Sequence, residues 1–162
     1  DNNLSLNNMT LIIVFAPEQM NYDQILLSSL DGNSGFENYI SQTDSILSYK
    51  QYFNSVLHDI GYYTVRYDVP NVAISMFSND SQILKLNGSY LTELPQQNAF
   101  FTQQVDITIG AHVNQNTNYY SGKIYEILLY DYSLSDYELR ELTLYFRKKW
   151  NLYLNEQQLF FE

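Results

Sequence analysis

Short apolar runs of strand length recur along the chain, and clusters of Asn, Asp, Gly and Ser separate them. Such spacing is typical of a β-sandwich or β-barrel. Residues 10–16 are apolar at nearly every position, which predicts a central strand covered on both faces. Residues 63–69 alternate between apolar and polar, which predicts a strand with one buried face. Residues 72–77 predict a further buried strand.

The strongest local signal is the segment 82–91, which reads Gln-Ile-Leu-Lys-Leu-Asn-Gly-Ser-Tyr-Leu. Asn87 and Gly88 supply the positive φ angles of a tight hairpin turn, and strand-forming residues flank them. Further strands are predicted at 105–110 and 122–130. The last of these is apolar on both faces, so other parts of the chain must cover each face.

One helix is predicted, over residues 136–149. Ser135 and Glu138 have the spacing of a capping box, in which each side chain satisfies a backbone donor of the other residue. Leu134 and Leu139 flank this cap as a hydrophobic staple, and the apolar spacing continues to Phe146. Basic residues at the end suit the helix dipole. We expect the apolar stripe to pack on the sandwich edge near residues 124–130.

The composition indicates one folded domain spanning residues 1–162. Hydrophobic residues make up 45% of the 162 residues and charged residues only 16%, which excludes the disordered class. The 16 Tyr and 9 Phe favour strands, and tyrosine also suits sugar-facing surfaces because its ring is amphipathic. A chain that begins at Asp1 rather than Met suggests processing, or excision from a longer polypeptide.

The formal net charge of −10 disfavours binding to nucleic acid and to anionic membranes, since both carry like charge. No apolar run is long enough to insert across a bilayer. The chain has no cysteine, which removes disulfides, thiolate metal sites and cysteine nucleophiles together. The absence of cysteine is neutral on localisation.

The order of elements in the C-terminal third resembles a known family. Residues 107–110, then 120–130, 133–138 and 145–150, give a strand, a Gly-containing turn, a strand that ends in Tyr, a short capped helix and a Lys-Trp ending. This order resembles the end of concanavalin A-like lectin/glucanase domains of the laminin G type. The hairpin at 83–88 resembles the central hairpin of the same family.

The resemblance implies an all-β fold, a two-sheet antiparallel jelly-roll sandwich with one short C-terminal helix. It does not imply one function, because this fold hosts lectins, glycosidases, adhesion modules and virion or fibre proteins. Related domains often have an additional strand before the one at 10–16. We therefore expect the chain to be part of a longer polypeptide or to borrow a strand from a neighbour.

Glycoside hydrolysis is the least favoured of the functions that the resemblance allows. It requires two carboxylates facing each other across the scissile bond, and the family's glucanases carry them as Glu-x-Asp-x-x-Glu on one strand. The chain has no such run. Asp131, Asp136, Glu138 and Glu141 lie around the helix start, where capping and the helix dipole explain the acids of the first turn. Glu126 stands alone on its predicted strand.

The sequence gives only weak support for a catalytic triad or a metal site. His58 and His112 are the only histidines, and neither has a Ser or Asp pattern that suggests a triad. Asp31 and Asn33 lie in an oxygen-rich turn of a kind that can hold calcium, although an ordinary turn explains the same residues. No other cofactor is expected.

The best binding candidate is the loop 112–120. Sugar recognition uses groups that donate and accept hydrogen bonds, together with an aromatic face for the C–H side of the ring. The candidate ligand-binding residues are His112, Asn114, Asn116, Asn118, Tyr119 and Tyr120. The alternative is an ordinary polar loop before a strand whose first tyrosines belong to the core.

Two functional classes therefore remain open. The first is a non-catalytic, lectin-like adhesion module that binds a glycan or protein partner on an extracellular or particle surface. The second is a structural component of a virion, fibre or surface layer that contacts neighbouring subunits or domains. Glycosylation sequons at Asn8, Asn79 and Asn87 fit secretion, but a composition so rich in Asn, Ser and Thr also produces them by chance.

Overall fold

The computed structural model describes residues 8–29, 35–42, 46–53, 56–77, 81–95, 107–112 and 117–152. The elements in chain order are β1 Met9–Pro17, β2 Gln24–Ser28, β3 Gly35–Ile40, β4 Ile46–Phe53, β5 Val56–Thr64, β6 Asn71–Phe77, β7 Ser81–Leu86, β8 Ser89–Pro95, β9 Thr108–Ile109, β10 Gly122–Tyr130 and α1 Asp136–Trp150. No helix among these residues is long and apolar enough to span a membrane.

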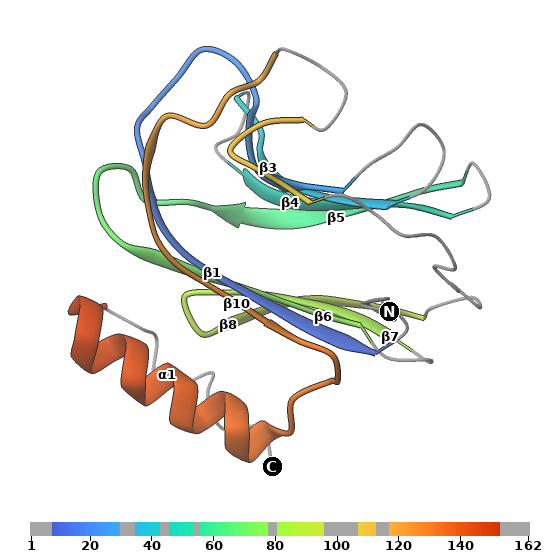
Figure 1. The fold of residues 1–162 in the computed structure, drawn as a ribbon, viewed down its shortest axis with the longest axis vertical. Helices are drawn as coiled ribbons and strands as arrows, with labels where there is room; N and C mark the ends of the chain where they lie inside the picture. The colour runs from blue at the N-terminus through green and yellow to red at the C-terminus, as the bar shows by residue number, and fades with distance from the viewer. Residues whose placement is uncertain are drawn as a thin grey trace.

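The strands form two five-stranded antiparallel sheets that face each other as two layers (Figure 1). Sheet A has the order β10-β1-β6-β7-β8, and sheet B has the order β5-β4-β3-β2-β9. Strands β1 and β10 are neighbours although the whole domain separates them in sequence. The architecture confirms the predicted all-β sandwich with one C-terminal helix.

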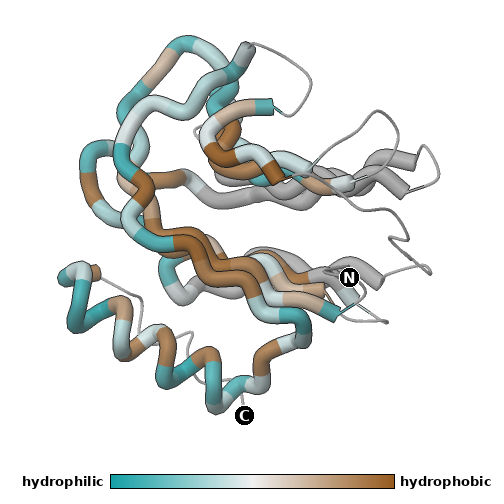
Figure 2. Tube along the Cα trace, viewed as in Figure 1, coloured by the Kyte–Doolittle hydropathy of each residue, from teal (hydrophilic) through white to brown (hydrophobic). Residues whose placement is uncertain are grey.

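Strand β1 is buried on both faces, as its apolar run predicts. Leu11, Ile13 and Phe15 point into the space between the sheets. Ile12 and Val14 point the other way, into a second cluster beneath α1. Figure 2 shows this apolar run continuing along the lower layer.

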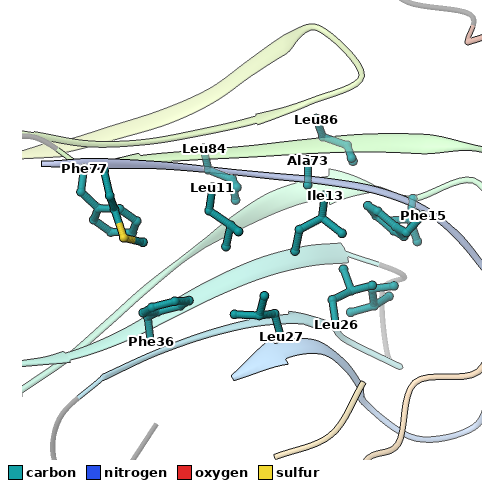
Figure 3. Close-up of a cluster of buried hydrophobic side chains, with 13 residues drawn as sticks. Leu11, Ile13, Phe15, Leu26, Leu27, Phe36, Ala73, Phe77, Leu84 and Leu86 are labelled. Carbon is teal, nitrogen blue, oxygen red and sulfur yellow. The ribbon is translucent and has the colours of Figure 1, made fainter. Parts of the chain in front are cut away.

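The main core fills the space between the two sheets. In Figure 3, side chains from the two layers point toward one another. Sheet B contributes Phe36, Leu26 and Leu27, and all three are almost fully buried. One polar contact crosses this core, where the Asn38 amide nitrogen donates to the Ser75 hydroxyl over 3.1 Å.

The helix α1 packs beside the edge strand β10, as we expected, and it also extends across the outer face of sheet A. Leu139 and Phe146 pack on Ile12, Val14 and residues of β6. The reason is that the outward residues of β1 and β6 are apolar as well, so the cluster extends beyond β10. Leu134 joins the same cluster as Leu139, which confirms the hydrophobic staple.

Glu126 fixes the far end of this helix to the sheet. Its carboxylate accepts hydrogen bonds from the Tyr145 hydroxyl at 3.1 Å, the Lys149 ammonium at 3.0 Å and the Trp150 indole at 3.1 Å. Burial raises the pKa of the Glu126 carboxyl, but these three donors outweigh it and leave the pKa below the ordinary value. The isolated acid of β10 is therefore a helix anchor.

The capping box at the start of α1 is confirmed. The backbone N–H of Glu138 donates to the Ser135 hydroxyl, and the Glu138 carboxylate accepts from the backbone N–H of Ser135 at 2.8 Å. The Tyr132 hydroxyl also donates to Glu138, at 3.1 Å. Glu138, one of the acids considered for catalysis, thus has a structural role.

The first testable consequence concerns this cap. Ser135→Ala should lower the free energy of unfolding by about 1 kcal/mol, because a backbone donor of the first turn loses its acceptor. Ser135→Asn is the matched control and should cost much less, since asparagine is an equally good cap and adds no charge beside Glu138. Urea denaturation of the two variants measures the difference. Equal costs would show that the cap does not stabilise the docked helix.

The predicted strand at 63–69 is wrong. Strand β5 ends at Thr64, and the chain then turns before β6. The physical reason is the buried side chain of Asn71, whose amide nitrogen donates to the carbonyls of Arg66 at 2.7 Å and Val69 at 2.9 Å. These bonds favour a turn over a ladder. Of the predicted strand at 105–110, residues 107–110 are described, and among these only β9, Thr108–Ile109, is a strand.

The hairpin turn at Asn87 and Gly88 is confirmed, with φ angles of 52° and 83°. The Asn87 side chain has a second role that the sequence does not reveal. Its carbonyl oxygen accepts from the backbone N–H of Val72 at 2.9 Å, and its nitrogen donates to the Asn71 carbonyl oxygen at 2.9 Å. The amide of this sequon is thus used in holding the hairpin to β6.

Candidate functional site

The candidate binding loop leaves and returns to one point on the edge of sheet B. Beside β2, the N–H of Gly110 donates to the Leu26 carbonyl at 2.9 Å, and the N–H of Ile25 donates to the Asn118 carbonyl at 3.0 Å. The N–H of Tyr120 then donates to the Gly110 carbonyl at 2.9 Å, which ties the two ends of the loop together. The two described ends of the loop are therefore fixed to the same edge of the sheet.

Two apolar side chains are exposed at this base. Ile109 lies opposite Leu27 in the β2–β9 register and is 58% exposed. Tyr119 lies beside Ile25 through a parallel bridge and is 50% exposed. The backbone bridge thus fixes an exposed aromatic ring at the edge of the sheet, and such a ring offers an amphipathic surface for contact.

Tyr120 faces the opposite way. Its ring packs against the main core, and its hydroxyl donates to the Lys123 carbonyl at 3.1 Å. Burial is the largest of several effects that raise the pKa of this hydroxyl well above its ordinary value. Tyr120 is therefore placed to support the base of the loop rather than to contact a ligand.

His112 lies over the neighbouring strand β3. Its Nε2 atom is 3.6 Å from a carboxylate oxygen of Glu37. Glu37 lies on the face of sheet B opposite Phe36 and Asn38, since successive strand residues alternate. The carboxylate is buried, with 5% exposure of the residue. The pair thus joins the loop to the outer face of sheet B.

A buried glutamine fixes the other side of the site. Gln24 accepts a hydrogen bond from the N–H of Ser121 at 2.9 Å and donates to the Glu18 carbonyl at 2.8 Å. The Ser121 hydroxyl completes the network by donating to the Glu18 carboxylate at 2.6 Å. These bonds hold the start of β10 against the connection that leaves β1, and Figure 1 shows the two segments side by side.

The structure describes four of the six predicted ligand-binding residues and does not gather them at one point: Asn118 and Tyr119 lie beside Ile25, whereas His112 lies beside Glu37 and Tyr120 faces the core. Asn118 adopts a left-handed backbone conformation, with φ of 59°, and this conformation suits the tight return to β2. Asn114 and Asn116 lie outside the described residues, and they stay predictions.

The predicted calcium turn at Asp31 and Asn33 also lies outside the described residues. Within the described ranges, no three His, Cys, Asp or Glu side chains form a group that could hold a metal ion. His58 lies in β5, opposite Gln51 in the strand register.

Three residues of the site, Glu18, Gln24 and Glu37, were not predicted from the sequence. Gln24 and Glu18 both contact Ser121, which lies about a hundred positions further along the chain, so no local pattern could connect them. Glu37 carries a weak signal, since it is an acid within the otherwise strand-like segment 35–40.

No protein-family profile matches the sequence, and no curated protein matches it. Solved structures do match in fold. The CBM40 domain of the Ruminococcus gnavus IT-sialidase has a TM-score of 0.72 at 24% identity, over 86% of this chain and 84% of that one. The same domain bound to α2,3-sialyllactose has a TM-score of 0.70 at 25% identity, with the same coverage.

Two further structures have the same architecture. Domain 4 of AbnA, an extracellular arabinanase from Geobacillus stearothermophilus solved with arabinotriose, has a TM-score of 0.74 at 16% identity, over 86% of this chain and 67% of that one. A pentraxin from Limulus polyphemus has a TM-score of 0.65 at 13% identity, over 86% and 70%. The chain thus has the fold of a two-sheet jelly-roll sandwich, which is consistent with the concanavalin A-like resemblance. These likenesses do not support the narrower laminin G type.

Proposed function

We propose that the chain is a non-catalytic glycan-binding module whose ligand contacts the base of the 112–120 loop. The observation that carries the proposal is Tyr119, an exposed aromatic ring fixed by the backbone at the edge of sheet B. Asn118, the preceding residue, and His112, at the other end of the loop, can donate and accept hydrogen bonds, as sugar hydroxyls require. The fold's likeness to the CBM40 domain of a sialidase and to an arabinanase domain solved with arabinotriose supports the same function.

The supporting shell of the site also fits this function. Loops on a rigid β-scaffold can carry recognition without disturbing the core. The ladder bonds to β2 and the Gln24 network restrict the motion of the loop base, so less conformational entropy is lost on binding. The module would act at an extracellular or particle surface, where several copies together give useful adhesion from weak single contacts.

The experiment that tests the proposal is a glycan array probed with the folded chain, followed by titration calorimetry of the retained glycans. We expect retention of at least one class of oligosaccharide with weak affinity for each copy. If no glycan is retained by a correctly folded chain, the proposed function is wrong.

The same proposal predicts no turnover. Incubation with the retained glycans, and with a panel of β-glucans, should release no reducing ends. Two candidate acids, Glu126 and Glu138, have their carboxylates hydrogen-bonded to the α1 helix or its cap, where they are unsuited to flank a scissile bond. Release that disappears on substitution of one carboxylate would contradict the non-catalytic assignment.

A further inference from the structure

Asn87 and Gly88, which form the tight turn between β7 and β8, are the only Asn-Gly step in the sequence. Asparagine before glycine is chemically labile in an unfolded chain, because glycine has no side chain to hinder attack by its backbone nitrogen on the asparagine amide. The residues that suit the turn best are thus also the residues most open to a spontaneous modification. The contacts of the Asn87 side chain decide how far the folded chain permits this reaction.

The reaction is a deamidation that needs only water. The backbone nitrogen of Gly88 attacks the Cγ atom of Asn87 and forms a C–N bond. The side-chain nitrogen of Asn87 leaves as ammonia, which carries away the proton lost by the Gly88 nitrogen, and a succinimide ring remains. Water then opens this ring at one of its two carbonyl carbons and leaves aspartate or isoaspartate. Ring closure therefore requires the Asn87 side chain to swing toward its own backbone.

The fold holds the Asn87 side chain toward β6 instead. Its carbonyl oxygen accepts from the backbone N–H of Val72 at 2.9 Å, and its nitrogen donates to the Asn71 side-chain oxygen at 2.9 Å. The backbone N–H of Asn87 also donates to the Val72 carbonyl, at 2.9 Å. Both side-chain bonds oppose the movement of Cγ toward the Gly88 nitrogen, so the reaction depends on local opening of the turn.

The partner of this amide, Asn71, is itself fixed. It is 0% exposed, and its nitrogen donates to the carbonyls of Arg66 at 2.7 Å and Val69 at 2.9 Å. Its oxygen accepts from the backbone N–H of Arg66 at 3.2 Å, in addition to the bond from Asn87. Asn71 therefore uses every donor and acceptor position of its amide, and rotation would leave buried groups unpaired.

We propose that Asn87 is a deamidation site, that the buried Asn71 amide protects it in the folded chain, and that the modification loosens the fold once it occurs. Aspartate at this position presents an oxygen where the amide nitrogen was, and a carboxylate oxygen cannot donate to Asn71. Two acceptors then face each other next to a buried group, which is unfavourable. The loosening extends beyond the hairpin, because the turn at 66–70 is bonded to the end of β1 through the Asp68 N–H and the Pro17 carbonyl at 2.9 Å.

The first test compares the folded chain with the same chain unfolded in guanidinium chloride, both incubated at mildly alkaline pH. Peptide mapping by mass spectrometry locates each amide-to-acid conversion. In the unfolded chain Asn87 should react faster than the other asparagines. In the folded chain it should react at least about tenfold more slowly, since local opening must precede the reaction. Equal rates in the two states overturn the protection, and an unfolded chain in which Asn87 is not the fastest site overturns the site itself.

A pair of variants tests the role of Asn71. Asn71→Ala removes the acceptor of the Asn87 amide, so the folded variant should deamidate at Asn87 several-fold faster than the native chain. Asn38→Ala is the matched control, because it removes another buried asparagine, whose amide donates to Ser75, without touching Asn87. Circular dichroism and thermal melting check that both variants fold. An equal acceleration in both variants, or none in a folded Asn71→Ala variant, overturns the role of Asn71.

Asn87→Asp tests the effect of the modification and does not depend on the Asn71 variant. This product mimic should unfold at a lower urea concentration than the native chain, because the carboxylate cannot replace the bond to Asn71. Asn21→Asp adds the same charge at an exposed position between β1 and β2 and should leave the unfolding midpoint unchanged. A midpoint for Asn87→Asp that equals that of the native chain or of Asn21→Asp overturns the loosening.

Discussion

Phe146→Ala should lower the free energy of unfolding by about 3–5 kcal/mol, the cost of removing a large aromatic side chain from a core. Phe146 is 0% exposed and packs in the cluster between α1 and the outer face of sheet A. The neighbouring side chains include Ile12 and Val14 of the central strand β1, so the cavity would lie directly beneath the main sheet. Chemical denaturation monitored by circular dichroism gives the value.

Leu144→Ala is the matched control for this prediction. Leu144 lies two residues earlier on the same helix but is 45% exposed, so its removal should change stability by only about 0.5 kcal/mol. If the two variants lose similar stability, the helix does not pack on sheet A as described. A small loss for both would show that α1 contributes little to the fold.

Gly122→Ala should cost about as much as the loss of Phe146, for a different reason. Gly122 begins β10 with φ of 134°, and a Cβ atom there would lie 2.2 Å from the backbone oxygen of Ala16. The backbone conformation contributes about 1–3 kcal/mol of strain, and relief of the clash adds a similar amount, roughly 1–3 kcal/mol. The clash involves backbone atoms, which no rotation of a side chain can relieve.

Gly110→Ala separates the cost of the positive φ angle from the cost of the steric clash. Gly110 also has a positive φ, 75°, but its added Cβ would meet only the Cβ of Tyr120 at an ordinary 3.8 Å. We expect this variant to lose roughly 1–2 kcal/mol, the cost of a left-handed backbone alone. Calorimetric unfolding of the two variants measures both values. A loss for Gly122→Ala no larger than that for Gly110→Ala would contradict the close approach of β10 to β1.

The sequence predicted the elements whose signals are local. The continuous apolar run of β1, the Asn87-Gly88 turn and the cap at Ser135 each lie within a few residues of the structure that they specify. The position of α1 was predicted less well, because the apolar faces of β1 and β6 together select where a helix docks.

The parts that could not be predicted depend on contacts between distant residues. Strand β3 carries the polar residues Glu37 and Asn38 at buried positions, so its apolar pattern is weak. The Asn38 amide nitrogen donates to Ser75 of the other sheet, and Asn71 bends the chain where alternation predicted a strand. The same limit applies to the site, where the loop was predicted but the supporting Gln24 was not.

The central claim is that Tyr119 at the edge of sheet B contacts a glycan, and one paired measurement tests it most directly. Tyr119→Ala and Tyr137→Ala both remove an exposed tyrosine ring, but Tyr137 lies on α1 and is 72% exposed. Calorimetric titration with a glycan retained by the native chain should show a loss of about tenfold or more for Tyr119→Ala, the effect of removing one binding anchor. Tyr137→Ala should bind as the native chain does. Unchanged affinity in a folded Tyr119→Ala variant, or equal losses in both variants, would contradict the account.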